Sequence, residues 1–134
     1  MKKIRILFQP KVAATRKNAG ELEKFLKSRG VQVWLCSAWE KEQACELLAG
    51  TDLLITVGGD GTILRAVQSV IPGKTPILGI NLGKLGFMTE IDADEATEKL
   101  PRLLDGKGWI DERAMLQAEL VSPGKEPQVF HALN

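Results

Sequence analysis

The feature of this sequence that most restricts the fold is a run of strand-forming residues followed at once by a glycine-rich turn. Leu53–Val57 contains only apolar and β-branched residues, which is typical of a short strand buried on both faces. Gly58–Thr62, with the sequence GGDGT, follows directly, and apolar residues then recur at helical spacing as far as Val70. A strand, a tight loop and a helix in this order form the first half of a β-α-β unit. We therefore expect a parallel sheet covered by helices.

The same alternation of β-rich and amphipathic segments extends over residues 1–105. Thr15 is expected to cap the first helix, Gly30 to end it, and Pro101 to kink or divide the last one. We predict a Rossmann-like α/β domain whose ligands bind beyond the carboxyl ends of its strands. The expected strands are Ile4–Phe8, Val31–Leu35, Leu53–Val57 and Pro76–Ile80, and the expected helices are Thr15–Arg29, Glu40–Ala49, Thr62–Val70 and Asp92–Asp105.

The pattern changes after residue 108. Trp109–Val121 alternates between apolar and polar residues, which predicts a half-exposed strand. Ser122–Gly124, with the sequence SPG, predicts a turn, and Gln128–Leu133 a second strand. Because an isolated hairpin is marginally stable in water, residues 109–134 are expected to open a β-rich second domain that the chain contains only in part.

Composition predicts a globular domain without affinity for nucleic acid or membranes. The 134 residues include 18 basic and 17 acidic side chains, a net charge of +1, whereas a general nucleic-acid binder needs a basic excess. The apolar runs are too short to span a bilayer, and Arg5 and Pro10 interrupt the segment where a secretory signal needs an apolar run. Cys36, Cys45 and the single histidine, His131, do not have the spacing of a zinc site, and we assign His131 no role. Two free thiols are typical of a reducing, cytoplasmic compartment.

The loop Gly58-Gly59-Asp60-Gly61 is a candidate phosphate site. Main-chain N–H groups at a helix N-terminus carry partial positive charge, and the three glycines allow a phosphate to approach them closely. Asp60 is the candidate catalytic residue, because a carboxylate here would hold Mg²⁺ against phosphates or accept a proton from an attacking hydroxyl. Asp60 could also cap the following helix. Arg65, one turn further along, would reach the same phosphates or be solvated.

Two better-known nucleotide motifs do not match this sequence. The tripeptide GKT at residues 73–75 resembles the end of a Walker A loop, but Gln68 stands where the first glycine is required. The dinucleotide pattern GxGxxG fails at its third glycine, where this chain has Leu64. A hydride-transfer cofactor loop is therefore not expected.

A second glycine-rich loop, residues 79–87, follows the last predicted strand of the sheet. Asn81 is expected to hydrogen-bond a base or ribose, Lys84 to meet a phosphate and Phe87 to stack on a purine. Phe87 could equally be a core aromatic, and Lys84 a solvated side chain. Both loops are expected to open on the same edge of the sheet, since the carboxyl ends of parallel strands lie together.

Taken together, the two loops resemble those of the NAD kinase family. The resemblance rests on GGDGT at residues 58–62, on GINLGKLGF at residues 79–87, and on ALN at residues 132–134, which is similar to the start of the family's Asn-Glu pair. It covers essentially the whole chain. The first loop is shared with diacylglycerol, sphingosine and phosphofructokinase relatives, and the second loop singles out the NAD kinases.

The resemblance implies an N-terminal α/β domain, a C-terminal β-rich domain and an active site between them. It implies a cytoplasmic homodimer or tetramer that binds small-molecule nucleotides. The implied reaction transfers a phosphoryl group from ATP, or from polyphosphate in some members, to the 2′-hydroxyl of the adenosine ribose of NAD, with a divalent metal, expected to be Mg²⁺.

The resemblance also implies roles for individual residues. Asp60 matches the proton acceptor, and Gly61 matches the neighbouring NAD contact. Arg65 matches a cofactor contact, Phe87 the adenine pocket and Asn134 the first half of the ribose-binding pair.

Two other functions stay open. A lipid kinase of the diacylglycerol type shares the first loop, although Asn81–Phe87 speak against it. A non-catalytic nucleotide-binding fragment would contain the same loops without turnover. Because most of the implied second domain is missing, residues 1–134 are expected to fold but to have little or no kinase activity alone.

Overall fold

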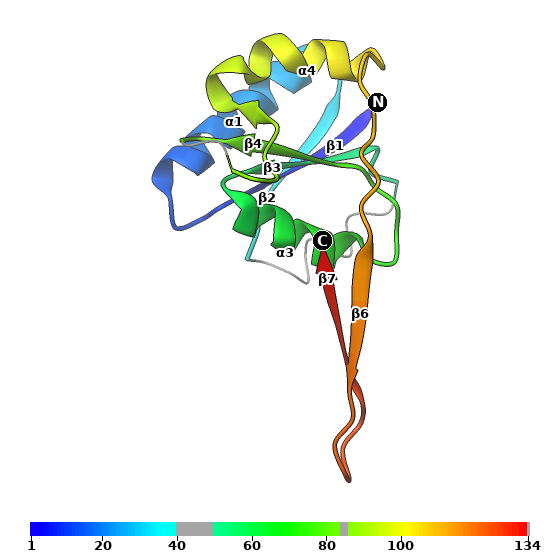
Figure 1. Cartoon of the computed structure of the whole chain (residues 1–134). Coiled ribbons are helices and arrows are strands. Elements are labelled where there is room, and N and C mark those ends of the chain that lie inside the picture. Colours follow the sequence, from blue (N-terminus) through cyan, green and yellow to red (C-terminus); the bar gives the residue numbers. More distant parts are fainter. Residues whose placement is uncertain (40–49, 84–85, 134) are drawn as a thin grey trace.

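The central element of the fold is a parallel β-sheet. The computed structural model describes residues 1–39, 50–83 and 86–133, and within them the sheet has five strands in the order β2-β1-β3-β4-β5 (Figure 1). Every neighbouring pair is parallel, which confirms the predicted α/β class. The strands are β1 (Lys3–Phe8), β2 (Gln32–Ser37), β3 (Leu53–Val57), β4 (Ile77–Asn81) and β5 (Ile91–Asp92).

Helices cover both faces of this sheet. Helices α1 (Ala13–Ser28) and α4 (Ala96–Leu104) lie on one face, and α3 (Asp60–Val70) lies on the other (Figure 1). A short 3₁₀ helix, η1 (Ala93–Glu95), leads into α4. This is the layered arrangement that β-α-β connections produce.

The core follows the alternation of side chains along the strands. Ile4, Ile6 and Phe8 of β1 pack with the buried residues of α1 and α4, whereas Leu7 packs on the other side with Ala66 of α3. All five residues of β3 are buried, which confirms the prediction of a strand covered on both faces. The carboxyl ends of β1, β3 and β4 are therefore held by a packed core on both sides.

The first helix ends as expected but begins differently. Gly30, with φ +78°, lies just beyond α1, where its N–H bonds to the carbonyl of Lys27. The N-cap, however, is Val12, so the prediction of Thr15 as the cap is wrong. The Thr15 hydroxyl lies inside the first turn and donates to the carbonyls of Gln9 and Val12. It therefore ties the start of α1 to the end of β1 rather than capping the helix.

Two further segments differ from the prediction. Pro101 was expected to kink or divide its helix, but α4 continues through it. Ala96 and Leu100 are fully buried on the same helix, and this packing outweighs the hydrogen bond that a proline removes. The chain before α4 also forms β5, which was not predicted. The predicted helix over residues 40–49, and with it Cys45, lies outside the described residues; Cys36 is a buried free thiol.

The remaining segment forms an antiparallel hairpin that extends away from the sheet (Figure 1). Its strands are β6 (Met115–Leu120) and β7 (Gln128–Leu133), joined by the predicted turn, where Lys125 N donates to Ser122 O at 3.1 Å. The first strand is shorter than predicted and is exposed on both faces, not one. The hairpin contacts α3 through the Gln68 side chain, which donates to the carbonyl of His131 at 2.9 Å. Within the described ranges, no helix has the length and hydropathy to cross a membrane.

Candidate functional site

The candidate site lies where the order of the strands reverses. Strand β1 has β2 on one side and β3 on the other, and ligands of doubly wound sheets bind in the crevice at such a point. Gln9 follows β1 and Gly58 follows β3. Main-chain hydrogen bonds hold both positions, because Gln9 N donates to Val57 O at 3.1 Å and Gly58 N donates to Ile80 O at 2.9 Å.

Position 58 requires glycine for two reasons: other side chains approach it closely, and its backbone conformation is one that residues with a side chain rarely adopt. It has φ +155°, and a Cβ atom there would collide with the Thr62 hydroxyl and come within 3.3 Å of Gln9 Cβ. The next residue, Gly59, is the N-cap of α3, so the alternative role of Asp60 as the cap is wrong. By contrast, Cβ atoms at Gly59 and Gly61 would point into open space. The first turn of α3 therefore presents its main chain to a region that a ligand can enter.

Asp60 is oriented by the second loop. One carboxylate oxygen accepts a hydrogen bond from Phe87 N at 2.9 Å and the other accepts one from Met88 N at 3.0 Å. These main-chain donors, Met88 first, then Phe87 and Thr89, lower the pKa of Asp60, while partial burial acts in the opposite direction. The carboxylate is thus ionised at neutral pH, and it keeps acceptor positions for a further partner, since it has about four in all.

The second loop is shaped to receive that carboxylate. A Cβ atom at Gly86 would collide with the Asp60 carboxylate and lie 3.0 Å from the Thr89 hydroxyl. The same hydroxyl accepts a hydrogen bond from Gly86 N at 2.8 Å. The sequence predicted that the two loops lie at one edge of the sheet, but not this close contact between the Asp60 carboxylate and Gly86, which we call the joint between the loops. Its signal was a glycine directly before Phe87, where close approach to another group excludes a side chain.

The predicted side chains of the second loop lie in different surroundings in the structure. Phe87 is 88% exposed, so the core alternative is wrong and its ring faces solvent next to Asp60. Asn81 lies at the carboxyl end of β4 and is buried. Lys84 and Asn134 lie outside the described residues. The ring of Phe87 is available for stacking, which stays a prediction.

Arg65 contacts an aromatic residue that sequence reasoning missed. Its guanidinium lies 3.8 Å from the centre of the Trp39 ring, and the ammonium of Lys11 lies 4.4 Å from the same ring. The indole N–H of Trp39 donates to the Gln9 side chain at 2.8 Å. The exposed Arg65 side chain therefore contacts the Trp39 ring, and its contact with a phosphate stays a prediction. A tryptophan four residues beyond the predicted strand Val31–Leu35 was the signal available in the sequence.

Comparisons with known proteins show the family to which the chain belongs. Residues 3–108 match the family model of the ATP-NAD kinase N-terminal domain. This chain belongs to the NAD kinase family. The NAD kinase of Dehalococcoides mccartyi is 44% identical over 134 residues, which are 99% of this chain and 47% of that protein. The NAD kinase of Chloroflexus aurantiacus is 36% identical over 134 residues, which are 100% of this chain and 49% of that protein.

Solved structures agree with the fold of the NAD kinase family. A yeast NADH kinase complexed with NADH superposes with a TM-score of 0.80 at 23% identity, over 98% of this chain and 46% of the yeast chain. An NAD kinase from Archaeoglobus fulgidus in complex with ATP has a TM-score of 0.61 at 25% identity, over 87% of this chain and 40% of the other. This chain spans about half the length of the curated NAD kinases that it matches.

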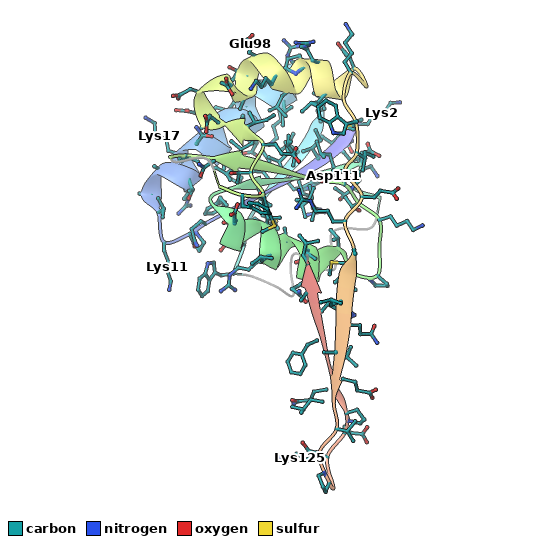
Figure 2. The ribbon with its side chains drawn as sticks, in the orientation of Figure 1. Lys2, Lys11, Lys17, Glu98, Asp111 and Lys125 are labelled. Atoms are coloured by element: carbon teal, nitrogen blue, oxygen red, sulfur yellow. The ribbon has the colours of Figure 1, made fainter. Side chains whose placement is uncertain are left out.

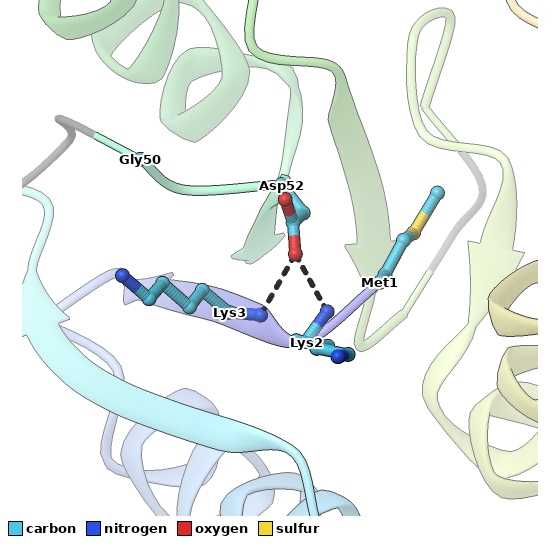
Figure 3. Close-up of a pocket in the computed structure, with 5 residues that line it drawn as sticks. All are labelled: Met1, Lys2, Lys3, Gly50 and Asp52. Carbon is cyan, nitrogen blue, oxygen red and sulfur yellow. Dashed lines mark hydrogen bonds between the residues drawn. The ribbon is translucent and has the colours of Figure 1, made fainter.

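An open hollow of about 690 Å³ lies at the opposite, amino edge of the sheet (Figure 3). It is lined by Met1, Lys2, Lys3, Gly50 and Asp52. The Asp52 carboxylate accepts hydrogen bonds from Lys2 N at 2.6 Å and Lys3 N at 2.9 Å, which lower its pKa. This carboxylate ties the start of β1 to the start of β3. We do not assign the NAD kinase site to the hollow, because it lies away from the carboxyl ends where parallel sheets bind ligands.

The residues at the carboxyl edge of the sheet, around Asp60, fit a metal ion that is bound mainly by the phosphates of its substrate. In the part of the chain that the structure describes, no three His, Cys, Asp or Glu side chains converge on a metal position. Mg²⁺ in phosphoryl-transfer enzymes commonly takes one or two carboxylates together with substrate phosphates and waters. Asp60 offers one such carboxylate beside the first turn of α3. A metal in an NAD kinase built on this edge would therefore arrive with the phosphates.

Proposed function

We propose that this chain supplies the phosphate-binding and proton-accepting part of an NAD kinase. The reaction is transfer of a phosphoryl group from ATP or polyphosphate to the 2′-hydroxyl of the adenosine ribose of NAD. The observation that supports it most directly is the Asp60 carboxylate, which is ionised, held by Phe87 N and Met88 N, and placed at the first turn of a helix behind a glycine loop.

In this proposal Asp60 receives the proton of the ribose hydroxyl as the hydroxyl oxygen bonds to phosphorus and the bond to the leaving phosphate breaks. A carboxylate with a lowered pKa is a weak base. Phosphoryl transfer tolerates a weak base, because its loose transition state depends mainly on positioning and electrostatics. Two main-chain N–H groups supply that positioning. When bound, Mg²⁺ supplies additional neutralisation of the phosphate charge.

The main chain around α3 would hold the transferring phosphate. The first turn of a helix carries partial positive charge, and Cβ atoms built at Gly59 and Gly61, beside this turn, would meet no described atom. In the same proposal, Phe87 lines the adenine pocket, Asn81 and Asn134 contact the nucleoside, and Arg65 contacts the cofactor. The exposure of the Phe87 ring, 88%, supports its part in this assignment.

We also propose that residues 109–134 open a second, β-rich domain. The hairpin is exposed along β6, and the chain spans about half the length of its curated relatives. The complete enzyme is proposed to be a cytoplasmic homo-oligomer. The lipid-kinase alternative has no support, because the family match extends across both loops.

A chimeric enzyme tests the proposed function. Residues 1–134 replace the matching half of the Dehalococcoides NAD kinase, and NADP formation is measured from NAD with ATP or polyphosphate. We expect activity in the chimera and little or none in residues 1–134 alone. Asp60→Asn should lower kcat about 10³-fold with little change in NAD affinity, as for loss of a general base.

Asp52→Asn is the matched control, because Asp52 also accepts two main-chain hydrogen bonds but lies at the opposite edge. It should leave kcat unchanged. An Asp60→Asn chimera that keeps the parent rate would contradict the assignment, and a chimera that binds NAD without turnover would favour the non-catalytic alternative.

A further inference from the structure

A single side chain joins the hairpin to the helix on which the candidate site begins. The amide of Gln68, on α3, donates to the main-chain carbonyl of His131, on β7, at 2.9 Å. The two residues are 63 positions apart in the sequence. Among the described residues, α3 makes the main contact of the α/β layer with β7. Gln68 therefore links the helix that begins at Asp60 to the segment that leads out of the α/β domain.

Burial along β7 shows that the hairpin is docked at one end rather than along its length. Residues 128–130 are exposed, whereas His131 and Leu133 are half-buried. The partner strand β6 is exposed throughout, and the hairpin extends from α3 to its tip near Lys125 (Figure 2). Because so little of the hairpin is buried, one hydrogen bond to α3 has a large share in fixing where β7 lies.

The carbonyl that Gln68 binds belongs to an edge strand. In the part of the chain that the structure describes, β7 pairs with β6 alone, so its other edge has no strand beside it. Main-chain groups along such an edge need partners from water, from side chains or from another strand. The imidazole of His131 has a separate contact inside the hairpin, 3.2 Å from the Gln117 side chain. The hydrogen bond to α3 is thus made by the main chain of His131 rather than by its ring.

The spacing puts the chain beyond β7 within reach of the first turn of α3. Gln68 lies eight positions after Asp60, which is about 12 Å along a helix. Asn134 lies three positions after His131, which an extended chain would span in about 10 Å. A slip of β7 by one residue along α3 would move the following chain by about 3.3 Å, which is more than a hydrogen bond tolerates. The position of β7 on α3 therefore matters for any group that follows β7.

We infer that Gln68 is a positioning residue for NAD: by holding the His131 carbonyl, its amide sets the position of β7, and of the chain that follows, relative to the Asp60 end of α3. The inference rests on the proposed function, in which Asn134 contacts the nucleoside and α3 holds the transferring phosphate. Gln68 touches neither substrate and acts through β7. The binding of NAD, and not that of the phosphate donor, therefore depends on Gln68.

The chimeric enzyme tests this through its two Michaelis constants. Gln68→Met removes the amide but keeps the length of the side chain. We expect the KM for NAD to rise about five-fold, as for loss of one hydrogen bond, while kcat, the KM for ATP and the unfolding temperature stay close to the parent values. Gln68→Lys, which keeps a donor at the end of a side chain of similar length, should restore the parent KM for NAD.

Gln117→Met is the matched control, because it removes a glutamine that contacts the same histidine from inside the hairpin and leaves the contact with α3 in place. It should not change the KM for NAD, and an equal rise would overturn the inference. So would a parent KM for NAD in Gln68→Met, or a joint change of both Michaelis constants and the unfolding temperature, since that pattern indicates a merely structural role. If Gln68→Met does not fold, Gln68→Asn, whose amide is shorter by one methylene, decides the matter by the same readout.

The two proposals fail separately. Calorimetric titration of the chimera with NAD measures binding without turnover. If the chimera binds NAD but makes no NADP, and Gln68→Met weakens that binding, only the proposed function is wrong. If the chimera is active and Gln68→Met leaves both the affinity and the KM for NAD unchanged, only this inference is wrong.

Discussion

Two aspartates at opposite edges of the sheet have nearly the same local chemistry. Asp52 accepts N–H groups from Lys2 and Lys3, Asp60 accepts them from Phe87 and Met88, and both have a lowered pKa. Their surroundings differ. Asp52 joins the starts of two strands, whereas Asp60 lies at a helix N-terminus with open space next to the neighbouring glycines. The two positions therefore differ in the backbone around the carboxylate, not in the carboxylate itself, and this difference is what favours Asp60 in the proposed function.

The hollow at the amino edge leads to the same conclusion about the surroundings of a carboxylate. It offers about 690 Å³, but its carboxylate is turned onto the main chain of the first residues (Figure 3). The carboxyl edge presents the N-terminal turn of α3, the exposed Phe87 and two cations, Lys11 and Arg65. Concavity alone does not mark the site, because a phosphate needs donors and positive potential.

Glycine substitutions should give the largest contrast between the two edges. Gly58→Ala should destabilise the fold by about 3 kcal/mol, since it combines a conformation that suits glycine with a steric collision against Thr62. Gly50→Ala, with φ +76° and nothing closer than Lys3 Nζ at 3.8 Å, should cost about 1 kcal/mol. Urea unfolding of both variants measures the difference, and equal losses would contradict it.

The joint between the two loops gives the next prediction. In the chimera, Gly86→Ala should lower kcat about 100-fold, because the new methyl group displaces the Asp60 carboxylate from its reacting position. Gly83→Ala is the control from the same loop, since a Cβ there would meet no atom of the described residues within 4 Å. If both variants keep the parent rate, the carboxylate does not depend on this joint.

A smaller effect is expected from the Thr89 hydroxyl. Thr89→Val removes the acceptor of Gly86 N, and the half-buried N–H then lacks a partner. We expect a loss of about 1–2 kcal/mol in stability, measured by urea unfolding. Thr97→Val, at an exposed position of α4, should be close to neutral, and an equal loss there would show that the hydroxyl of Thr89 contributes nothing specific.

The smallest expected effect is a loss of folding stability at acidic pH, to which Asp52 and Asp60 both contribute. A carboxylate whose pKa is lower in the folded state stabilises the fold above its unfolded pKa, and this contribution disappears as pH falls through the folded pKa. For Asp52 and Asp60 the loss therefore occurs below their ordinary value of 3.8. Asp52→Asn and Asp60→Asn should each narrow the stability difference between neutral and acidic solution. Thermal unfolding from pH 7 to pH 2 measures this, and unchanged acid sensitivity in either variant would contradict it.

Much of the fold could be predicted from the sequence because its signals are local. The buried strand β3 and the predicted turn of the hairpin follow from the order of apolar residues, glycine and proline. The errors are tertiary in origin. Thr15 bonds back to β1 instead of capping α1, and α4 tolerates Pro101 because its apolar side is buried.

The candidate site likewise has features that could be predicted from local sequence and features that could not. Residue order alone was enough to predict that an aspartate among glycines follows a buried strand, and that a second glycine loop follows a later strand. The close approach of Gly86 to the Asp60 carboxylate and the contact of Arg65 with Trp39 depend on the packing of distant segments and could not be predicted. Local pattern selects strands, turns and helices because their hydrogen bonds and periodicity span a few residues. Contacts between loops 20 or more residues apart depend on the parallel register that the packed core imposes.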